Sequence, residues 1–181
     1  MPHKLTHSKL VILDRDGVIN HDSDHYIKSP DEWQPIPGSL EAIAKLNQAG
    51  YHIAVATNQS GIGRGLYDMD TLNAIHMKFH RLLAKVGGHV DAIFFCPHTD
   101  ADGCRCRKPL PGMIEQISQR YGVPIVGDSV RDLVAGVSVG AEPHLVLTGK
   151  GEKARASGGL PPYTAIHQDL MAFVNHFIGR T

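Results

Sequence analysis

Short apolar runs alternate along the chain with segments in which apolar residues recur at helical spacing. The apolar runs predict strands over 9–14, 51–56, 91–95, 123–127 and 143–147. The segments between and after them predict helices over 38–49, 69–86, 111–121, 130–139 and 167–178. Short strands that alternate with helices are typical of a parallel sheet covered on both faces. We therefore predict an α/β fold, a doubly wound parallel sheet with helices on both sides.

The predicted helices have recognisable ends. Asp68 is placed to cap the helix over 69–86, Gly50 follows the first helix, and Pro111 opens the third. By contrast, the segment 149–162 is rich in Gly, Lys and Pro, and we expect it to be a flexible surface loop.

Length and composition limit the class of protein. With 181 residues, the chain is expected to form one domain over 1–181. Lys and Arg total 18, as do Asp and Glu, which argues against a general nucleic-acid or membrane-surface binder. No apolar run approaches the about 20 residues that cross a bilayer, and the N-terminus lacks the pattern of a secretory signal. We expect a cytoplasmic protein with no nucleic-acid or membrane partner, and a monomer, because no apolar stripe is left over.

All three cysteines lie in one short segment, together with a histidine. Cys96, His98, Cys104 and Cys106 follow the pattern Cys-x-His-x5-Cys-x-Cys. An odd number of cysteines is a poor disulfide framework, whereas three thiolates and one imidazole form a complete tetrahedral ligand set for structural zinc. The plain alternative is a chance cluster of free thiols. We predict a Zn²⁺ loop over 96–108 that leaves no coordination position open for catalysis.

Polar clusters lie where successive predicted strands end or a helix begins. They are Asp14-Arg15-Asp16-Gly17, Thr57-Asn58-Gln59-Ser60, Arg107-Lys108-Pro109 and Gly127-Asp128-Ser129. Each cluster alone could be ordinary turn or cap chemistry. The carboxyl ends of parallel strands, however, meet at one edge of the sheet, where open sheets bind ligands. We therefore expect these clusters to form a single site.

The residue types in these clusters suit phosphoryl transfer. Asp14 and Asp128 offer the hard oxygen ligands that Mg²⁺ prefers. A carboxylate such as Asp14 can act as a nucleophile, and Asp16 can protonate the leaving oxygen and then activate water. Lys108 and Thr57 can bind the charge on the transferring group. The predicted reaction is transfer of a phosphoryl group to Asp14 and then to water.

The order of these motifs over residues 10–132 resembles the haloacid dehalogenase (HAD) superfamily of phosphohydrolases. The matching motifs are Asp-x-Asp-Gly, a Thr after the second strand, a later Lys, and Gly-Asp-Ser-x-x-Asp. The resemblance implies that Asp14 is the nucleophile and Asp16 the general acid and base. It also implies that Thr57 and Lys108 stabilise the phosphoryl group, and that Asp14, the main-chain carbonyl of Asp16, and Asp128 bind Mg²⁺.

Three longer segments are similar to the heptose bisphosphate phosphatases within that superfamily. They are 14–20 (DRDGVIN), 57–65 (TNQSGIGRG) and the Cys–His segment 96–109. The resemblance implies a sugar phosphate substrate, D-glycero-D-manno-heptose 1,7-bisphosphate, which loses its 7-phosphate on the route to ADP-heptose and the lipopolysaccharide core. It further implies zinc in the Cys–His loop and a part for Arg107 in substrate recognition.

The spacing of the motifs leaves no room for a separate cap domain. The intervals from Asp14 to Thr57 and from Thr57 to Lys108 are already occupied by predicted helices, strands and the zinc loop. Specificity is therefore expected to come from the loops 20–37, 58–67 and 96–109. Within them we expect substrate contacts from Asn20, Asp22, Asn58, Gln59, Ser60 and Arg107.

Other functions share parts of this pattern. A histidinol-phosphate phosphatase has the same Asp-x-Asp and zinc loop, but the stretch 61–65 favours the heptose enzymes. A polynucleotide 3′-phosphatase uses the same motif set, and the balanced charge argues against it. A non-catalytic zinc-stabilised binding module would have no need for Asp16. His76 and His80 are expected to be ordinary helix residues, and Lys150 remains a candidate for a place near the substrate.

Overall fold

In the part of the chain that the structure describes, six parallel strands form one sheet in the order β3-β2-β1-β4-β5-β6. The computed structural model describes residues 9–118 and 124–180. The strands are β1 (Leu10–Leu13), β2 (His52–Asn58), β3 (Ala92–Cys96), β4 (Pro124–Gly127), β5 (Glu142–Val146) and β6 (Ala165–His167). The chain builds outward from β1 in one direction and then returns to place β4 on its other side. In such sheets, ligands bind beyond the carboxyl ends of the strands where the order reverses, here between β1 and β4.

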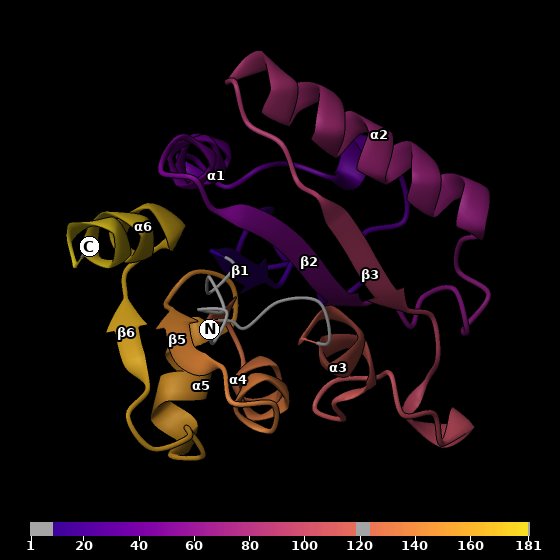
Figure 1. Ribbon diagram of the computed structural model, residues 1–181. Coiled ribbons are helices and arrows are strands. Elements are labelled where there is room, and N and C mark those ends of the chain that lie inside the picture. The colour runs from indigo at the N-terminus through magenta and orange to yellow at the C-terminus, as the bar shows by residue number, and fades with distance from the viewer. Residues whose placement is uncertain (1–8, 119–123, 181) are drawn as a thin grey trace, which may run out of the picture.

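Helices cover both faces of the sheet (Figure 1). On one face lie α1 (Ser39–Gln48), α2 (Met69–Lys85) and α6 (Leu170–Gly179). On the other lie α3 (Gly112–Ser118), α4 (Val130–Val137) and α5 (Gly151–Ser157). Two short 3-10 helices, η1 (Pro30–Glu32) and η2 (Asp100–Asp102), lie in the loops. This architecture confirms the predicted α/β fold class.

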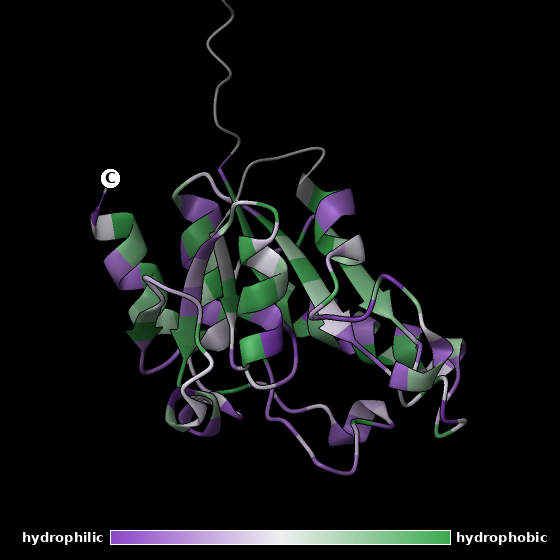
Figure 2. Ribbon diagram, turned by 90° about the horizontal axis from the view of Figure 1, so that it is seen from below, coloured by the Kyte–Doolittle hydropathy of each residue, from purple (hydrophilic) through white to green (hydrophobic). Residues whose placement is uncertain are grey.

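Each face of the sheet has its own apolar core. Alternate residues of β1 divide between the two, with Val11 and Leu13 in one cluster and Leu10 and Ile12 in the other. In Figure 2 the apolar positions concentrate in the strands and on parts of the helices, while the connecting loops are mostly hydrophilic. No helix among the described residues is long and apolar enough to span a membrane.

Local sequence explains where the longest helix begins and which face it buries. The carboxylate of Asp68 accepts a hydrogen bond of 2.8 Å from the main-chain N–H of Thr71 and so caps α2, as predicted. The helix buries Leu72, Ile75 and Phe79 at helical spacing. This packing holds α2 against the sheet beside the loop that follows β2.

The segment after β5 differs from its prediction. Residues 149–162 were expected to be a loop, but they contain α5, whose buried residues are only Gly151 and Ala154. So narrow a buried face leaves almost no apolar period to detect. The chain then adds the short strand β6, which was not predicted, and α6 begins at Leu170 because the Asp169 carboxylate caps it.

The third predicted helix is found from Gly112, and its predicted end beyond residue 118 lies outside the described residues. Residue 123 of the fourth predicted strand lies outside them too.

Candidate active site

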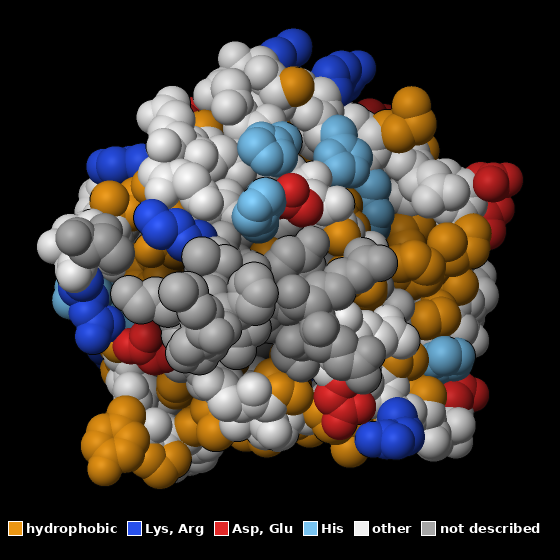
Figure 3. Space-filling model, in the orientation of Figure 1, with side chains coloured by type: hydrophobic (Ala, Val, Ile, Leu, Met, Phe, Trp, Pro, Cys, Tyr) orange, Lys and Arg blue, Asp and Glu red, His pale blue; other side chains and the backbone are white. Residues whose placement is uncertain are grey.

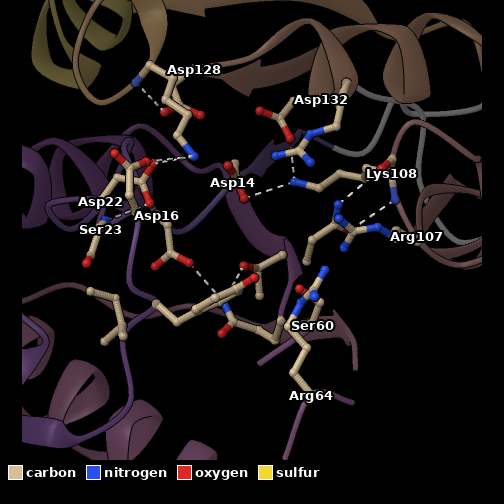
Figure 4. Close-up of a pocket in the computed structure, with 18 residues that line it drawn as sticks. Asp14, Asp16, Asp22, Ser23, Ser60, Arg64, Arg107, Lys108, Asp128 and Asp132 are labelled. Carbon is tan, nitrogen blue, oxygen red and sulfur yellow. Dashed lines mark hydrogen bonds and ion pairs between the residues drawn. The ribbon is translucent and has the colours of Figure 1, made fainter. Parts of the chain in front are cut away.

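A cavity of about 210 Å³ lies beyond the carboxyl ends of the central strands (Figure 4). Nearly all the residues predicted for the site line it: Asp14, Asp16, Asp22, Thr57, Asn58, Gln59, Ser60, Arg107, Lys108 and Asp128. Asn20 does not line the cavity and is buried behind Asp16. The structure therefore brings residues from four separate chain segments to one polar cavity.

Asp14 occupies the centre of this site. It directly follows β1, and its main-chain N–H donates to the carbonyl of Val126 in β4, so the sheet fixes its position. Burial raises the pKa of Asp14 to about 7, the nearby charge of Asp132 adds to the rise, and the ammonium group of Lys108 opposes it. Without a further cation, the site therefore holds more carboxylate charge than it can stabilise.

Asp128 faces Asp14 from the end of β4. Its carboxylate packs against Gly17 and Gly149, and a Cβ at either position would overlap it. The main-chain N–H of Lys150 donates to Oδ2 of Asp128 at 2.8 Å. Burial and the charge of Asp14 raise the pKa of Asp128 to about 9. Gly17 and Gly149 both have positive φ and so allow the chain to enclose the Asp128 carboxylate. When this carboxylate is ionised, its negative charge has no adjacent cation among the described residues to balance it.

A divalent cation fits this arrangement. Carboxylate oxygens of Asp14, Asp128 and Asp132 lie within 4.8 Å of one another. Asp132 already binds Lys108 and caps α4 through Ser129, which leaves Asp14 and Asp128 as the pair in greatest need of a cation. The residues present therefore suit Mg²⁺.

The carboxylate of Asp16 belongs to a different set of contacts. Its Oδ1 accepts hydrogen bonds of 2.9 Å from Arg15 Nε and from Asn20 Nδ2, and its Oδ2 accepts one of 3.0 Å from Gln59 Nε2. Burial alone would raise the pKa of Asp16, but the Arg15 charge and these hydrogen bonds outweigh burial and hold it below its ordinary value. Any contribution of Asp16 to a metal site is thus left to its main-chain carbonyl, as the family resemblance implied.

Lys108 reaches Asp14 from the segment before α3. Its Nζ lies 2.9 Å from Asp14 Oδ1 and 2.5 Å from Asp132 Oδ1. Burial disfavours the ammonium ion, but the two carboxylates outweigh it and raise the pKa of Lys108. The Asn58 side chain anchors the main chain here, because its amide donates to the carbonyl of Lys108 and accepts from the N–H.

Several cations and polar groups that were not assigned to the site also line the cavity. Arg64 and Arg131 were overlooked, Asp132 was noted only as part of a motif, and Lys150 pairs with Asp22 at 3.2 Å. The Arg64 guanidinium lies over the Tyr26 ring, at 5.9 Å from its centroid. The presence of Arg64 in the 58–67 loop was the signal that could have identified it.

The four predicted zinc ligands converge beside the cavity. The Sγ atom of Cys96 lies 3.4 Å from His98 Nδ1 and 3.6 Å from Cys104 Sγ, and His98 Nδ1 lies 3.3 Å from Cys106 Sγ. These separations approach the roughly 3.7 Å between ligands at the corners of a zinc–thiolate tetrahedron. The Cys96 and Cys106 sulfurs are closer, at 2.9 Å, and all three cysteines are free thiols. The cluster could hold a metal ion.

The fold and the site define a HAD-like phosphatase, and comparison with known families agrees. Residues 9–136 match the family described as polynucleotide kinase 3 phosphatase, and residues 105–172 match a HAD-hydrolase-like family. The chain also superposes with a TM-score of 0.78 on a HAD-like phosphatase of Mesorhizobium loti that is 31% identical, covering 96% of this chain and 87% of that one.

Relatives that match over nearly their whole length identify a particular family of HAD-like phosphatases. A D-glycero-beta-D-manno-heptose-1,7-bisphosphate 7-phosphatase of Bordetella bronchiseptica is 58% identical over 94% of this chain and 98% of its own length. A protein of the same name from Neisseria meningitidis is 52% identical over 94% and 95%. A crystal structure of the B. bronchiseptica enzyme with magnesium and phosphate matches with a TM-score of 0.94, at 57% identity, and covers 96% of this chain and 99% of that one. The chain belongs to the D-glycero-beta-D-manno-heptose-1,7-bisphosphate 7-phosphatase family, within the wider polynucleotide kinase 3 phosphatase group.

Proposed function

We propose that this protein hydrolyses the 7-phosphate of D-glycero-β-D-manno-heptose 1,7-bisphosphate through an aspartyl-phosphate on Asp14. The chemistry is supported by the convergence of Asp14, Asp16, Lys108 and Asp128 on one cavity. The substrate is supported by one observation above all: 58% identity to an enzyme of that name over nearly the whole of both chains. The β-anomer is taken from the names of the relatives.

In the first step, a carboxylate oxygen of Asp14 forms a bond to the phosphorus of the 7-phosphate. The bond between phosphorus and the sugar oxygen breaks, and Asp16, reacting from the minor protonated form that its lowered pKa leaves, gives its proton to that leaving oxygen. Lys108 Nζ, beside Asp14, donates hydrogen bonds to the phosphoryl oxygens as their charge is redistributed. The Thr57 hydroxyl lines the same cavity and supplies a further donor.

In the second step, water attacks the phosphorus of the aspartyl-phosphate. Asp16, now ionised, accepts a proton from the water, and the bond between phosphorus and Asp14 breaks. The products are inorganic phosphate and regenerated Asp14. The hydrogen bonds from Arg15 and Gln59 stabilise Asp16 in the ionised form that this step requires.

Mg²⁺ would be held by Asp14, Asp128 and the main-chain carbonyl of Asp16, and would supply charge neutralisation between phosphate and carboxylates. The raised pKa values of Asp14 and Asp128, both caused first by burial, support a cation at this point. The metal in the similar crystal structure is also magnesium.

Four cations around the cavity suit a substrate with a second phosphate. Arg64, Arg107, Arg131 and Lys150 line it in addition to Lys108. Arg64 and Arg107 lie in loops that were expected to supply specificity, and Lys150 lies in the turn before α5. None of the four is required for chemistry at Asp14. We propose that they recognise the parts of the sugar bisphosphate away from the reacting phosphate, together with Asp22, Asn58, Gln59 and Ser60.

We further propose that Cys96, His98, Cys104 and Cys106 hold one structural zinc ion. All four positions are filled by protein groups, so this zinc would take no part in the reaction. We also propose a single capless domain over 1–181 and a monomer. Light scattering of the purified protein would test whether the protein is a monomer.

The decisive experiment compares turnover of heptose 1,7-bisphosphate, histidinol phosphate and a 3′-phosphorylated oligonucleotide, each with Mg²⁺. We expect kcat/KM to be highest for the heptose substrate, and higher for its β- than its α-anomer. On the face in Figure 3, basic and acidic side chains are dispersed. The equal numbers of basic and acidic residues in the whole chain, 18 of each, argue against the oligonucleotide. A higher kcat/KM for either other substrate would overturn the proposal.

A further inference from the structure

We propose that His76 and Tyr67 are positioning residues that fix the general acid Asp16 from behind, His76 through Arg15 and Tyr67 through Gln59. The inference rests on the proposed phosphatase function and extends it to two residues that do not touch the substrate cavity. It is carried by an unbroken set of hydrogen bonds that runs from α2 and from the loop after β2 to both oxygens of Asp16.

The two oxygens of Asp16 are not equivalent. Oδ1 accepts from Arg15 Nε and from Asn20 Nδ2, so both of its lone pairs are used. A second guanidinium nitrogen, Nη2 of Arg15, lies 2.9 Å from the same oxygen. Among the described residues, Oδ2 accepts only the hydrogen bond from Gln59, which leaves it one free lone pair. Oδ2 is therefore the oxygen that carries the proton to the leaving group, and Oδ1 is the anchor.

The anchor depends on His76. The Arg15 side chain is completely buried, where a guanidinium ion must have its N–H groups paired. Its Nη1 lies 3.1 Å from Nε2 of His76, on α2. Burial and the Arg15 charge lower the pKa of His76 to about 3, so the imidazole is neutral and Nε2 accepts the hydrogen bond. The hydrogen bonds from Nε to Asp16 and from Nη1 to His76 together fix the plane of the guanidinium group.

The other oxygen of Asp16 is held by Gln59, and Tyr67 in turn fixes the Gln59 side chain. Its Nε2 donates to Asp16 Oδ2 and to Thr57 Oγ1, while its Oε1 accepts a short hydrogen bond of 2.6 Å from the Tyr67 hydroxyl. Burial raises the pKa of Tyr67 to about 12, so the hydroxyl keeps its proton and remains a donor. Tyr67 thereby determines which end of the Gln59 amide faces Asp16. A reversed amide would present an oxygen to the carboxylate and repel it.

A defect in a general acid has a distinctive kinetic signature. An alkyl phosphate releases a strongly basic alkoxide and needs the proton, whereas an aryl phosphate such as p-nitrophenyl phosphate releases a stable phenolate and does not. The quantity kcat/KM reports only steps up to the first irreversible one, so the later use of Asp16 as a base does not enter. Loss of positioning should therefore reduce kcat/KM for the alkyl substrate selectively.

The test measures kcat/KM with Mg²⁺ for a sugar phosphate and for p-nitrophenyl phosphate. For His76→Leu we expect kcat/KM to fall about ten-fold on the sugar phosphate and less than two-fold on the aryl phosphate. The ten-fold loss is a part of the about 10²–10⁴-fold that a general acid contributes. His76→Gln, whose Oε1 can accept the Arg15 hydrogen bond, should restore most of the loss. His80→Leu, an exposed neighbour one turn further along α2, is the matched control and should leave both rates unchanged.

Tyr67→Phe removes a single hydroxyl and keeps the test available if His76→Leu does not fold. It should lower kcat/KM selectively for the sugar phosphate by about three-fold, which corresponds to the loss of one hydrogen bond. Equal losses on both substrates, or no loss on either, would overturn the proposal. If wild-type protein failed on heptose bisphosphate, the proposed substrate would be wrong, but the comparison could still be made with any alkyl phosphate that it hydrolyses.

Discussion

Nζ of Lys108 lies 2.9 Å from Oδ1 of Asp14, although the two residues are 94 positions apart in the chain. The same ammonium group lies 2.5 Å from Asp132 Oδ1, and all three side chains are largely buried. One cation therefore restrains both Asp14 and the first turn of α4. Loss of this cation should affect catalysis and folding by separate routes.

Lys108→Met should reduce kcat by about 10²–10³-fold, because one donor to the transferring phosphoryl group is lost. It should also lower the free energy of unfolding by about 3 kcal/mol, because Asp132 is left buried without its partner. Steady-state kinetics and urea unfolding would measure the two effects.

The double variant Lys108→Met with Asp132→Asn separates these routes. We expect it to regain part of the stability and none of the activity. Recovery of activity in the double variant would contradict the role given to Lys108.

Asp14→Asn should abolish turnover, because an amide neither attacks phosphorus nor binds Mg²⁺ well. Asp16→Asn should lower kcat by about 10²–10⁴-fold, because the nucleophile is intact but the proton donor is lost. Mass spectrometry after rapid quenching should find a phosphoryl group on wild-type protein and none on Asp14→Asn. Near-normal activity of Asp14→Asn would rule out the covalent mechanism.

The stability of the magnesium-free protein should fall as pH rises from about 5 to about 9. Folding raises the pKa of Asp14 to about 7 and of Asp128 to about 9, from an ordinary value of 3.8, so the native state binds more protons than the unfolded chain. Such groups stabilise the fold fully below the ordinary pKa, and this contribution is lost as pH rises through the raised values. Thermal unfolding in a buffer from which only magnesium is omitted would measure it.

Added Mg²⁺ should stabilise the protein more at pH 8 than at pH 6, because protons no longer compete for the two carboxylates. Asp128→Asn serves as the control, since it removes one of the two groups and leaves the buried histidine His144, whose lowered pKa acts in the opposite direction. Equal pH dependence in wild type and Asp128→Asn would show that these carboxylates are not responsible.

The sequence brings the proposed catalytic groups to one cavity because each group follows a strong local signal. Asp14, Thr57 and Asp128 lie at the carboxyl ends of apolar strands, and the topology of a parallel sheet necessarily brings such ends together. The Cys–His cluster is equally local, since its four residues lie within one short segment. The fold class and the residues that line the cavity could therefore be predicted without coordinates.

The supporting contacts could not be predicted in this way. His76 lies on the buried face of α2 and looks like a helix residue of no special role, yet its contact with Arg15 spans 61 positions. The pairing of Lys150 with Asp22 also joins two loops whose relative position depends on the whole sheet. α5 was overlooked because it buries too few apolar residues to produce a period.

The Cys–His loop also positions a cation of the active site. Nε of Arg107 lies 2.5 Å from Oδ1 of Asp100 in η2, between the second and third residues of the Cys–His cluster, and Arg107 directly follows Cys106. Structural zinc contributes an apparent ~10–16 kcal/mol in small peptides, enough to order a loop with so little apolar core. The zinc site should therefore determine where Arg107 and Lys108 enter the cavity.

Cys106→Ser should reduce the zinc content of the purified protein from one ion per chain and should raise KM or lower kcat by displacing Arg107 and Lys108. Binding of Mg²⁺ at Asp14 and Asp128 should be largely unchanged, because the two sites use different ligands. Arg105→Ser is the matched control: Arg105 is exposed in the same loop and should keep both zinc and activity. Full activity in wild-type protein without zinc, or unchanged kinetics in zinc-free Cys106→Ser, would show that the loop needs no metal to position these cations.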